Sequence, residues 1–173
     1  VLMGLLFKLY RKSKSGKKST DALALKLPVF GPLLKKVAVA NFTRTLGTMI
    51  SSGVPIIHAL EITAKTSGNV VLEEVILEVR SGISEGQSIA EPLSENDIFP
   101  SMVIQMISVG EATGALDTML EKIADFYDDE VDAAVDTLTS MLEPLLMVFL
   151  GGAIGGLVIS MYLPIFKMAA ALG

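Results

Sequence analysis

The sequence contains no cysteine and only one histidine, His58. The lack of cysteine excludes disulfides, thiolate metal sites and cysteine nucleophiles. His58 cannot form a metal-binding cluster by itself, and no recognisable motif supplies it with partners for a catalytic triad. A G-x-S-x-G elbow, an H-E-x-x-H helix and a glycine-rich nucleotide loop are also missing. We therefore expect no enzymatic activity, no metal and no cofactor, and we expect a protein that works through contact and movement.

Charged side chains are missing from one long segment near the end of the chain. From Leu145 to Phe166, 22 residues pass without a Lys, Arg, His, Asp or Glu. A helix needs ~20 apolar residues to cross a hydrocarbon core of ~30 Å, and a backbone in lipid must satisfy its own hydrogen bonds. We predict a transmembrane helix over residues 144–166 and a short tail over 167–173. The apolar residues 1–7 are too few to span a bilayer and are interpreted as the end of a truncated transmembrane helix.

The two signs of charge are unevenly distributed along the chain. Ten of the 14 Lys and Arg residues, but only one of the 19 acids, lie at or before Arg44. Basic residues collect on the cytoplasmic side of membrane helices, so we interpret residues 8–32 as a basic cytoplasmic linker. This linker would also attract anionic lipid headgroups. No aromatic platform accompanies the lysines, and binding of nucleic acid is therefore not expected.

Residues 33–143 show the periodicity of helices separated by short breaks. Apolar residues recur at spacings of three and four, and no stretch alternates convincingly with period two. The expected buried stripes contain Phe42, Leu46, Met49 and Ile50; Ile56, Ile57, Leu60 and Ala64; Leu72, Val75, Ile76 and Val79; Val103, Met106 and Ile107; and Leu116, Met119, Leu120, Ile123, Tyr127, Ala134, Leu138 and Leu142. We predict an all-α fold, a bundle of about six antiparallel helices whose last helix continues into the transmembrane helix.

Acidic residues recur about every four positions on this last helix: Asp117, Glu121, Asp125, Asp128, Asp129, Asp132 and Asp136. This spacing places carboxylates on one helix face, where like charges four residues apart destabilise the helix. The favoured interpretation is a solvated face opposite the apolar stripe. A basic partner or a hard cation such as Ca²⁺, which oxygen ligands suit, remains an alternative. Asp125, Asp128, Asp129 and Asp132 are therefore candidate interface residues.

The junction Gly110-Glu111-Ala112-Thr113-Gly114 is expected to join the last two helices tightly. We predict that Gly114 caps the preceding helix in the left-handed conformation. Glu111 is expected near the start of the last helix, where unpaired N–H groups and the helix dipole favour an anion. Gly110, Glu111, Gly114 and Leu116 are candidate interface residues. The junction is either a purely structural cap or a point that couples the bundle to the membrane.

Gly151, Gly152, Gly155 and Gly156 form two overlapping G-x-x-x-G pairs in the predicted transmembrane helix. Glycines four residues apart make a flat surface on which another helix can pack closely. Pro144 and Pro164 stand at the two ends of the same segment, and we include both among the candidate helix-packing residues. Packing against other transmembrane helices of the same protein and self-association are both consistent with this pattern.

Three blocks of the sequence resemble one protein family. They are LPVFGPLLKKVAVANFTRTLGTMISSGVPIIHAL, SVGEATGALDTML and LEPLLMVFLGGAIGGLVISMYLPIF. They are similar, in the same order, to the inner-membrane platform protein of bacterial type II secretion and type IV pilus machines. The matching motif residues are Gly53, Pro55, Gly110, Glu111, Gly114, Leu116, Pro144 and Pro164. Two helical cytoplasmic domains alternate with three transmembrane helices in that family, and this chain resembles the second half.

The resemblance implies a non-enzymatic scaffold in the bacterial inner membrane, with the bundle of residues 33–143 in the cytoplasm and the tail in the periplasm. The implied partners are the cytoplasmic assembly ATPase, pilin or pseudopilin, other subunits of the machine, the lipid bilayer and further copies of the chain. The alternative is a subunit of a membrane transporter or channel. Such a subunit would need an ionisable residue inside the membrane segment, and Leu145–Phe166 has none.

Overall fold

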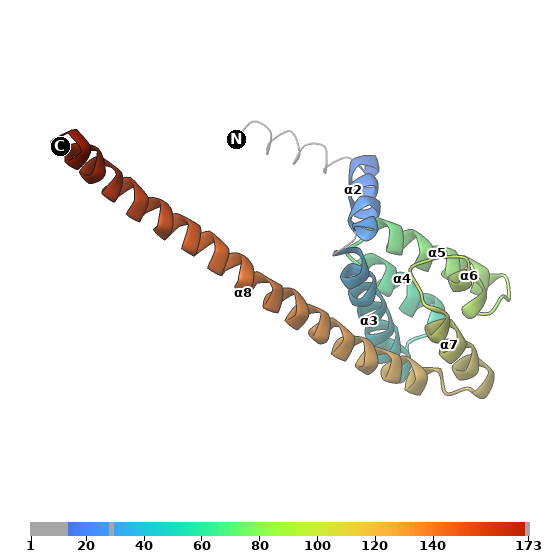
Figure 1. Cartoon of the computed structure of the whole chain (residues 1–173). Helices are drawn as coiled ribbons and strands as arrows, with labels where there is room; N and C mark the ends of the chain where they lie inside the picture. The colour runs from blue at the N-terminus through green and yellow to red at the C-terminus, as the bar shows by residue number, and fades with distance from the viewer. Residues whose placement is uncertain (1–13, 28–29, 172–173) are drawn as a thin grey trace. The chain divides into compact units, whose positions relative to one another are not determined.

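The computed structural model describes residues 14–27 and 30–171, with side chains described at 18–25, 27 and 30–162. Within these ranges every regular element is a helix, so the predicted all-α class is confirmed. The helices are α2 (Lys14–Lys26), α3 (Phe30–Ser51), α4 (Ile56–Thr66), α5 (Val70–Ser84), α6 (Ala90–Ser94), α7 (Ser101–Thr113) and α8 (Leu116–Ala171) (Figure 1). The chain divides into two compact units, Val1–Asp132 and Ala133–Gly173, and each is described by itself.

Local signals explain where most of these helices begin and end. Helix α4 starts directly after Pro55, which has no N–H to leave unpaired. Helix α5 starts after Asn69, whose side chain accepts hydrogen bonds from the N–H groups of Val71 and Leu72. Glycines with positive φ at positions 53, 68, 86 and 114 occupy the breaks. Helices separated by short breaks were expected from the sequence, and the break at Gly114 lies in the junction that was predicted there.

Helix α2 lies in the segment that was interpreted as a linker, and the sequence analysis predicted no helix there. Its first half, KSGKKST, has weak helix propensity and no apolar stripe. Tertiary contacts hold it instead. The buried carboxylate of Asp21 accepts a hydrogen bond from the N–H of Val70 at 3.1 Å, which satisfies the first turn of α5. The Nζ of Lys18 lies 2.6 Å from a carboxylate oxygen of Glu74, also on α5.

One hydrophobic core fills the first unit. Its largest fully buried side chains come from α3, α4, α5, α7, α8 and the α6 region: Phe42, Leu46, Leu60, Leu72, Ile76, Ile89, Leu93, Ile107, Leu120 and Ile123. The rings of Phe42 and Phe99 meet edge to face at 5.1 Å between centroids. Most of the expected stripe residues are buried here. Ile57, in the first turn of α4, is an exception. Its side chain is exposed and is not covered by the other described helices.

Helix α8 runs without a break from Leu116 to Ala171, through Pro144 and the four glycines. It is the one helix in the described chain that is long and apolar enough to cross a membrane. The predicted continuation of the last helix is therefore confirmed. Leu142, which was expected in the buried stripe, is exposed in the second unit, where α8 is the only element described.

Candidate functional site

The junction between α7 and α8 is built on the backbone conformation of Gly114. Gly114 adopts φ 72° and ψ 13°, the left-handed region predicted for it. The N–H of Ala115 donates to the carbonyl of Gly110 at 3.0 Å, and the N–H of Gly114 donates to that of Glu111 at 3.4 Å. These two bonds satisfy carbonyls at the end of α7 and define a Schellman motif. The conformation of this turn is therefore fixed by Gly114 and by these two hydrogen bonds.

Because Gly110 has no side chain, the backbone of α7 lies close to the first turn of α8. A methyl group added at Gly110 would lie 3.0 Å from the Cα of Leu116 and 3.0 Å from the Cγ of Met119. Both distances are shorter than ordinary van der Waals contacts between carbon atoms. Leu116 and Met119 form the first turn of α8, so the absent side chain of Gly110 fixes how closely α7 meets that turn. The sequence analysis singled out Gly110 and Leu116, and the structure brings them together.

Glu111 serves a different helix from the one expected. Its carboxylate accepts the N–H of Ile89 through both oxygens, at 3.2 and 3.0 Å. Ile89 is the N-cap residue of α6, whereas the sequence analysis placed Glu111 at the start of α8. The difference arises because Glu111 lies on a face of α7 that packs on α6, and this neighbour is distant in sequence. Glu111 therefore fastens the α6 region to the junction.

A second close approach holds the first part of α8 against α3. A methyl group added at Gly47 would lie 3.2 Å from the Cβ of Leu120. Next to it, the Nη2 of Arg44 donates to carboxylate oxygens of Asp125 at 2.7 Å and Asp128 at 2.5 Å. About two turns earlier on α3, the Nζ of Lys36 lies 2.7 Å from a carboxylate oxygen of Glu130. The hydrogen bonds that Arg44 donates to Asp128 and Asp125 raise the pKa of Arg44, so it remains fully charged.

The sequence analysis missed the role of Gly47 and of these two basic residues. A signal was present, because Lys36 and Arg44 are eight residues apart and so lie near one face of α3. Their partners, however, follow more than eighty residues later. For part of the acidic stripe, the chain itself therefore supplies a basic partner, which was one of the alternatives to a solvated face.

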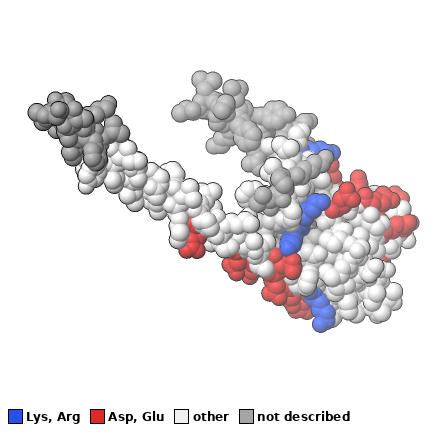
Figure 2. Space-filling model, viewed as in Figure 1, with Lys and Arg blue, Asp and Glu red and all other residues white. Residues whose placement is uncertain are grey.

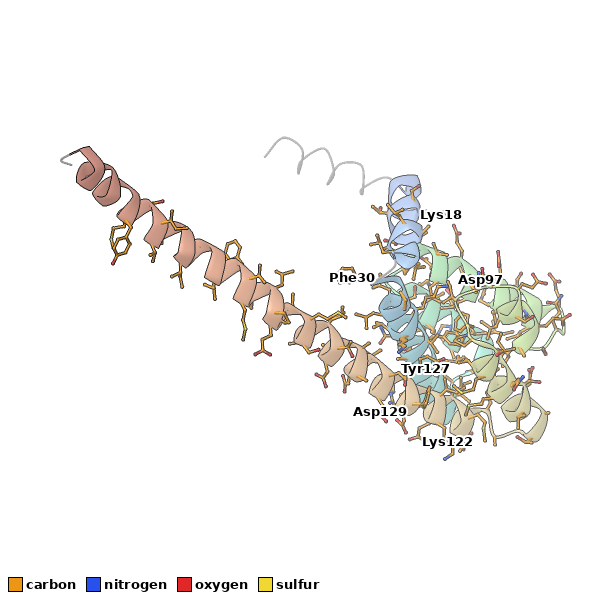
Figure 3. All side chains as sticks on the ribbon, in the orientation of Figure 1. Lys18, Phe30, Asp97, Lys122, Tyr127 and Asp129 are labelled. Atoms are coloured by element: carbon orange, nitrogen blue, oxygen red, sulfur yellow. The ribbon has the colours of Figure 1, made fainter. Side chains whose placement is uncertain are left out.

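The acidic candidates divide into two groups. Asp125 and Asp128 are paired with Arg44, while Asp129 and Asp132 are exposed and have no ion pair within the described residues. Figure 3 shows Asp129 on the side of α8 that faces away from α3, and Tyr127 on the side that faces it. Figure 2 shows acidic residues gathered around the few basic ones on this face of the first unit. Groups of three or more metal-ligating side chains are absent among the residues whose positions are described.

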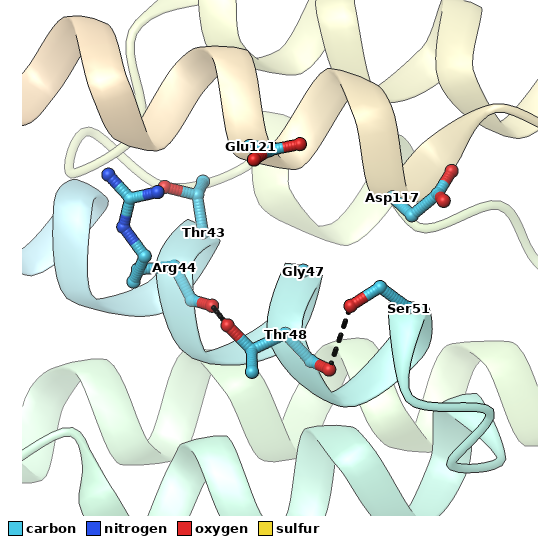
Figure 4. Close-up of a pocket in the computed structure, with 7 residues that line it drawn as sticks. All are labelled: Thr43, Arg44, Gly47, Thr48, Ser51, Asp117 and Glu121. Carbon is cyan, nitrogen blue, oxygen red and sulfur yellow. Dashed lines mark hydrogen bonds between the residues drawn. The ribbon is translucent and has the colours of Figure 1, made fainter.

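A small open cavity of about 120 Å³ lies between α3 and α8, beside Gly47. It is lined by Thr43, Arg44, Gly47, Thr48, Ser51, Asp117 and Glu121 (Figure 4). The hydroxyls of Thr48 and Ser51 donate to backbone carbonyls of their own helix, at 2.7 and 3.0 Å. No histidine lines the cavity, and neither hydroxyl donates to its two carboxylates, Asp117 and Glu121. The cavity is a polar gap beside the close approach at Gly47.

The glycines of the apolar segment are described within the second unit alone. Gly151, Gly152, Gly155 and Gly156 all lie inside α8, and a methyl group added at any of them would meet no atom within 4 Å. Large apolar side chains between Leu145 and Tyr162 are exposed. Pro164 lies in α8, and its side chain is outside the described set, as is the tail after Ala171. The glycine surface is therefore unoccupied by the described part of the chain.

Comparison with known proteins identifies the family. The family model for "Type II secretion system (T2SS), protein F" matches residues 42–164, which include the junction, the α3–α8 contact and most of the apolar segment. The chain belongs to this family. Among its relatives, the type IV pilus assembly protein PilC of Myxococcus xanthus is 66% identical over 163 residues, which are 94% of this chain and 39% of that protein.

Members named for both machines are similar to this chain. The type IV pilus assembly protein PilC of Pseudomonas aeruginosa is 41% identical over 172 residues, covering 99% of this chain and 46% of that protein. The type II secretion system protein F of Xanthomonas campestris is 33% identical over 172 residues, covering 99% of this chain and 42% of that protein. The chain thus spans less than half the length of these relatives, as its resemblance to the second half of the family implies.

Proposed function

We propose that this chain is the second half of a non-enzymatic platform protein in the bacterial inner membrane. In this role it links a cytoplasmic assembly ATPase to the polymerisation of pilin or pseudopilin. The observation that carries the proposal is α8, one helix that begins in the packed core of the first unit and continues through the apolar segment. Such a helix supplies a mechanical connection between a cytoplasmic partner and the membrane. Family membership supports the same role.

Two parts of the first unit could take part in this mechanism, one by binding the ATPase and the other by transmitting its movement. Asp129 and Asp132 are exposed on α8 and lack ion pairs within the described part of the chain, so they are available to a basic surface of the ATPase. The junction at Gly110, Glu111 and Gly114 sets how the first turn of α8 packs on α7. A movement of α6 or α7 that the ATPase induces would then be transmitted to α8 through contacts of Glu111 and Gly110. We assign the bundle to the cytoplasm on the basis of the basic residues before it.

Co-purification tests the partner surface. In the full-length protein, the double variant Asp129→Lys and Asp132→Lys should lose association with the ATPase, because like charges would then face each other. The matched control is Glu78→Lys, a charge reversal at an exposed residue of α5, which should retain the association. Retained binding by the double variant would show that the ATPase does not use this surface of α8.

Substitutions of Glu111 test whether the junction transmits movement from α6 and α7 to α8. Glu111→Gln keeps an acceptor for the N–H of Ile89, whereas Glu111→Ala leaves that buried N–H unpaired, a loss of about 1–3 kcal/mol in the free energy of unfolding. If the junction transmits movement, Glu111→Gln should retain stability and ATPase binding but reduce filament assembly. Normal filament assembly by this variant, with stability also retained, would reduce the role of Glu111 to a structural cap.

A further inference from the structure

The corner between α2 and α3 exposes a cluster of large apolar side chains. Leu23, Leu27, Phe30 and Leu34 are 64%, 44%, 54% and 37% exposed. The described chain before α8 has four other exposed large apolar residues, one on α4, one on α5 and two that are seven positions apart on α7: Ile57, Leu77, Met102 and Val109. Scattered apolar residues are normal on a protein surface, whereas a cluster indicates a site of interaction. We refer to Leu23, Leu27, Phe30 and Leu34 together as the apolar corner.

The four residues come from the two sides of the break between α2 and α3. Leu23 lies in the last turn of α2 and Leu27 directly follows that helix. Phe30 and Leu34 are four positions apart on α3, and neighbours at this spacing share a helix face. The N–H of Gly31 donates to the carbonyl of Leu27 at 2.8 Å, which keeps the two pairs close at the break between the helices. Figure 3 shows the Phe30 side chain at the start of α3, pointing away from the body of the first unit.

The chain around the apolar corner is basic. Residues 14–36 contain six lysines and one acid, Asp21. Asp21 is buried with its carboxylate on the N–H of Val70, so it does not oppose an anionic partner. Lys18 and Lys36 have ion pairs with Glu74 and Glu130, while Lys35 donates to the neutral carbonyl of Asp97 and keeps its charge uncompensated there. Apolar side chains flanked by lysines suit the headgroup region of an anionic bilayer.

A second copy of the chain fits this surface less well. Two apolar corners facing each other would bring two basic segments together, which is repulsive. The rest of the bundle is acidic and would attract the lysines, but its exposed large apolar residues are spread over α4, α5, α7 and α8, away from one another in sequence. A bilayer supplies both components, since it has hydrocarbon beneath negative headgroups. The apolar segment of α8 keeps the protein at a membrane in any case.

We propose that the apolar corner inserts into the anionic leaflet of the membrane, with Leu23, Leu27, Phe30 and Leu34 below the headgroups and the neighbouring lysines among them. Helices of this kind bury their apolar face to a depth of ~5–10 Å. The first unit is then attached to the bilayer at a site of its own, in addition to the connection through α8. This attachment is independent of the ATPase and of filament assembly.

Fluorescence quenching by lipids tests this insertion directly. The chain has no cysteine, so Leu23→Cys, Phe30→Cys and Leu34→Cys each give one labelling position for an environment-sensitive fluorophore. The full chain is placed, one copy per nanodisc, in a mixture of phosphatidylcholine and phosphatidylglycerol that contains nitroxide-labelled lipid. Matched controls are Ile57→Cys and Leu77→Cys, because each native side chain is 39% exposed, close to the 37% of Leu34.

We expect quenching at positions 23, 30 and 34 to be several-fold stronger than at positions 57 and 77, and to weaken when phosphatidylcholine replaces phosphatidylglycerol. Equal quenching at all five positions would overturn the insertion. Quenching at the corner that is identical in phosphatidylcholine alone would overturn the role given to the lysines. If the fluorophore at the corner becomes shielded only when two copies share a nanodisc, a second copy covers the surface and the proposal is wrong.

Discussion

At the scale of single residues, the junction depends on what two glycines lack. Gly114 has the left-handed backbone that ends α7, and Gly110 has no side chain to hold the first turn of α8 away. The two requirements differ. Gly114 is needed for its backbone conformation, and Gly110 is needed because a side chain there would collide with α8. Only the first of them could be derived from the sequence, since a helix that stops at a glycine is a local pattern.

Gly110→Ala should destabilise the first unit. The added methyl group would meet Leu116 and Met119 at 3.0 Å. Overpacking of this kind costs about 1–3 kcal/mol, and the better helix propensity of alanine offsets about 1 kcal/mol. Urea unfolding of the full chain in detergent, followed by circular dichroism, measures the difference. Ser108→Ala on the same helix is the control and should change little, and an unchanged or raised stability for Gly110→Ala would contradict the close approach.

Tyr127 should make folding sensitive to alkaline pH. Burial, with a smaller contribution from the charge of Glu130, raises the pKa of Tyr127 above its ordinary value of 10.0. Below that value the phenol is neutral in both states and contributes nothing. Above it, the unfolded chain loses the proton more readily, so the free energy of unfolding falls as the pH rises.

The measurement compares Tyr127→Phe with the unsubstituted chain between pH 8 and about 11, above the ordinary pKa of tyrosine. Lysines titrate in the same range, so the difference between the two proteins is the quantity of interest. Stability should decline less steeply in Tyr127→Phe. Parallel curves would show that Tyr127 ionises as readily in the folded protein as in the unfolded one.

At the scale of elements, α8 carries three surfaces of different chemical character. Between Leu116 and Asp132, one face packs on α3 and α7, and another presents Asp129 and Asp132 to solvent. From Leu145 to Phe166 the helix is apolar around its whole circumference, with a surface of four glycines. Ion pairs from Arg44 and Lys36 fix the first surface, and the exposed glycines leave the third free for another helix.

Arg44→Met should weaken the contact between α3 and α8 by a small and salt-dependent amount. The variant keeps most of the aliphatic stem and removes the bonds to Asp125 and Asp128. Exposed ion pairs contribute about 0.2–1 kcal/mol each, and salt screens them. Urea unfolding at low and high salt should show a difference that shrinks as salt is added. A loss that is the same at both salt concentrations would indicate that packing of the arginine stem, and not its charge, stabilises the contact.

The glycine surface is expected to mediate association in the membrane. Gly152→Leu and Gly155→Leu should each reduce cross-linking between membrane helices, because the new side chain would hold the partner away. A contact of this type is worth on the order of 1–2 kcal/mol. The control is Ala153→Leu, which adds similar bulk outside the two glycine pairs. Equal cross-linking in all three variants would show that this surface does not meet another helix.

At the scale of the whole molecule, the distribution of charge predicts an orientation. The net charge of -5 combines a basic beginning with an acidic remainder. Basic residues next to a membrane segment mark the cytoplasmic side, so the first unit should lie in the cytoplasm and the end of α8 in the periplasm.

Single cysteines test this orientation without background from native thiols. In whole cells, a membrane-impermeant maleimide should label Ala171→Cys and should label Ser101→Cys, an exposed position on α7, only after permeabilisation. The reverse pattern would invert the proposed topology. It would also remove the cytoplasmic ATPase as a partner of the bundle.

The sequence by itself determined the features that depend on neighbours along the chain. These are the all-α class, the breaks, the left-handed cap at Gly114, the apolar segment and the continuation of the last helix into it. Helical periodicity, glycine conformation and the hydrophobicity of a long segment are local properties, and so the sequence displays them directly. The three blocks of family resemblance were equally visible.

Tertiary structure alone decided which distant residues meet. Helix α2 forms in a lysine-rich segment because Asp21 and Lys18 contact α5. Glu111 binds the N–H of Ile89 and not the start of α8, and Arg44 divides the acidic stripe into paired and unpaired carboxylates. The physical reason is the same in each case. Hydrogen bonds and ion pairs require a particular donor within about 3 Å of a particular acceptor, and for residues far apart in sequence only the packing of helices creates that proximity.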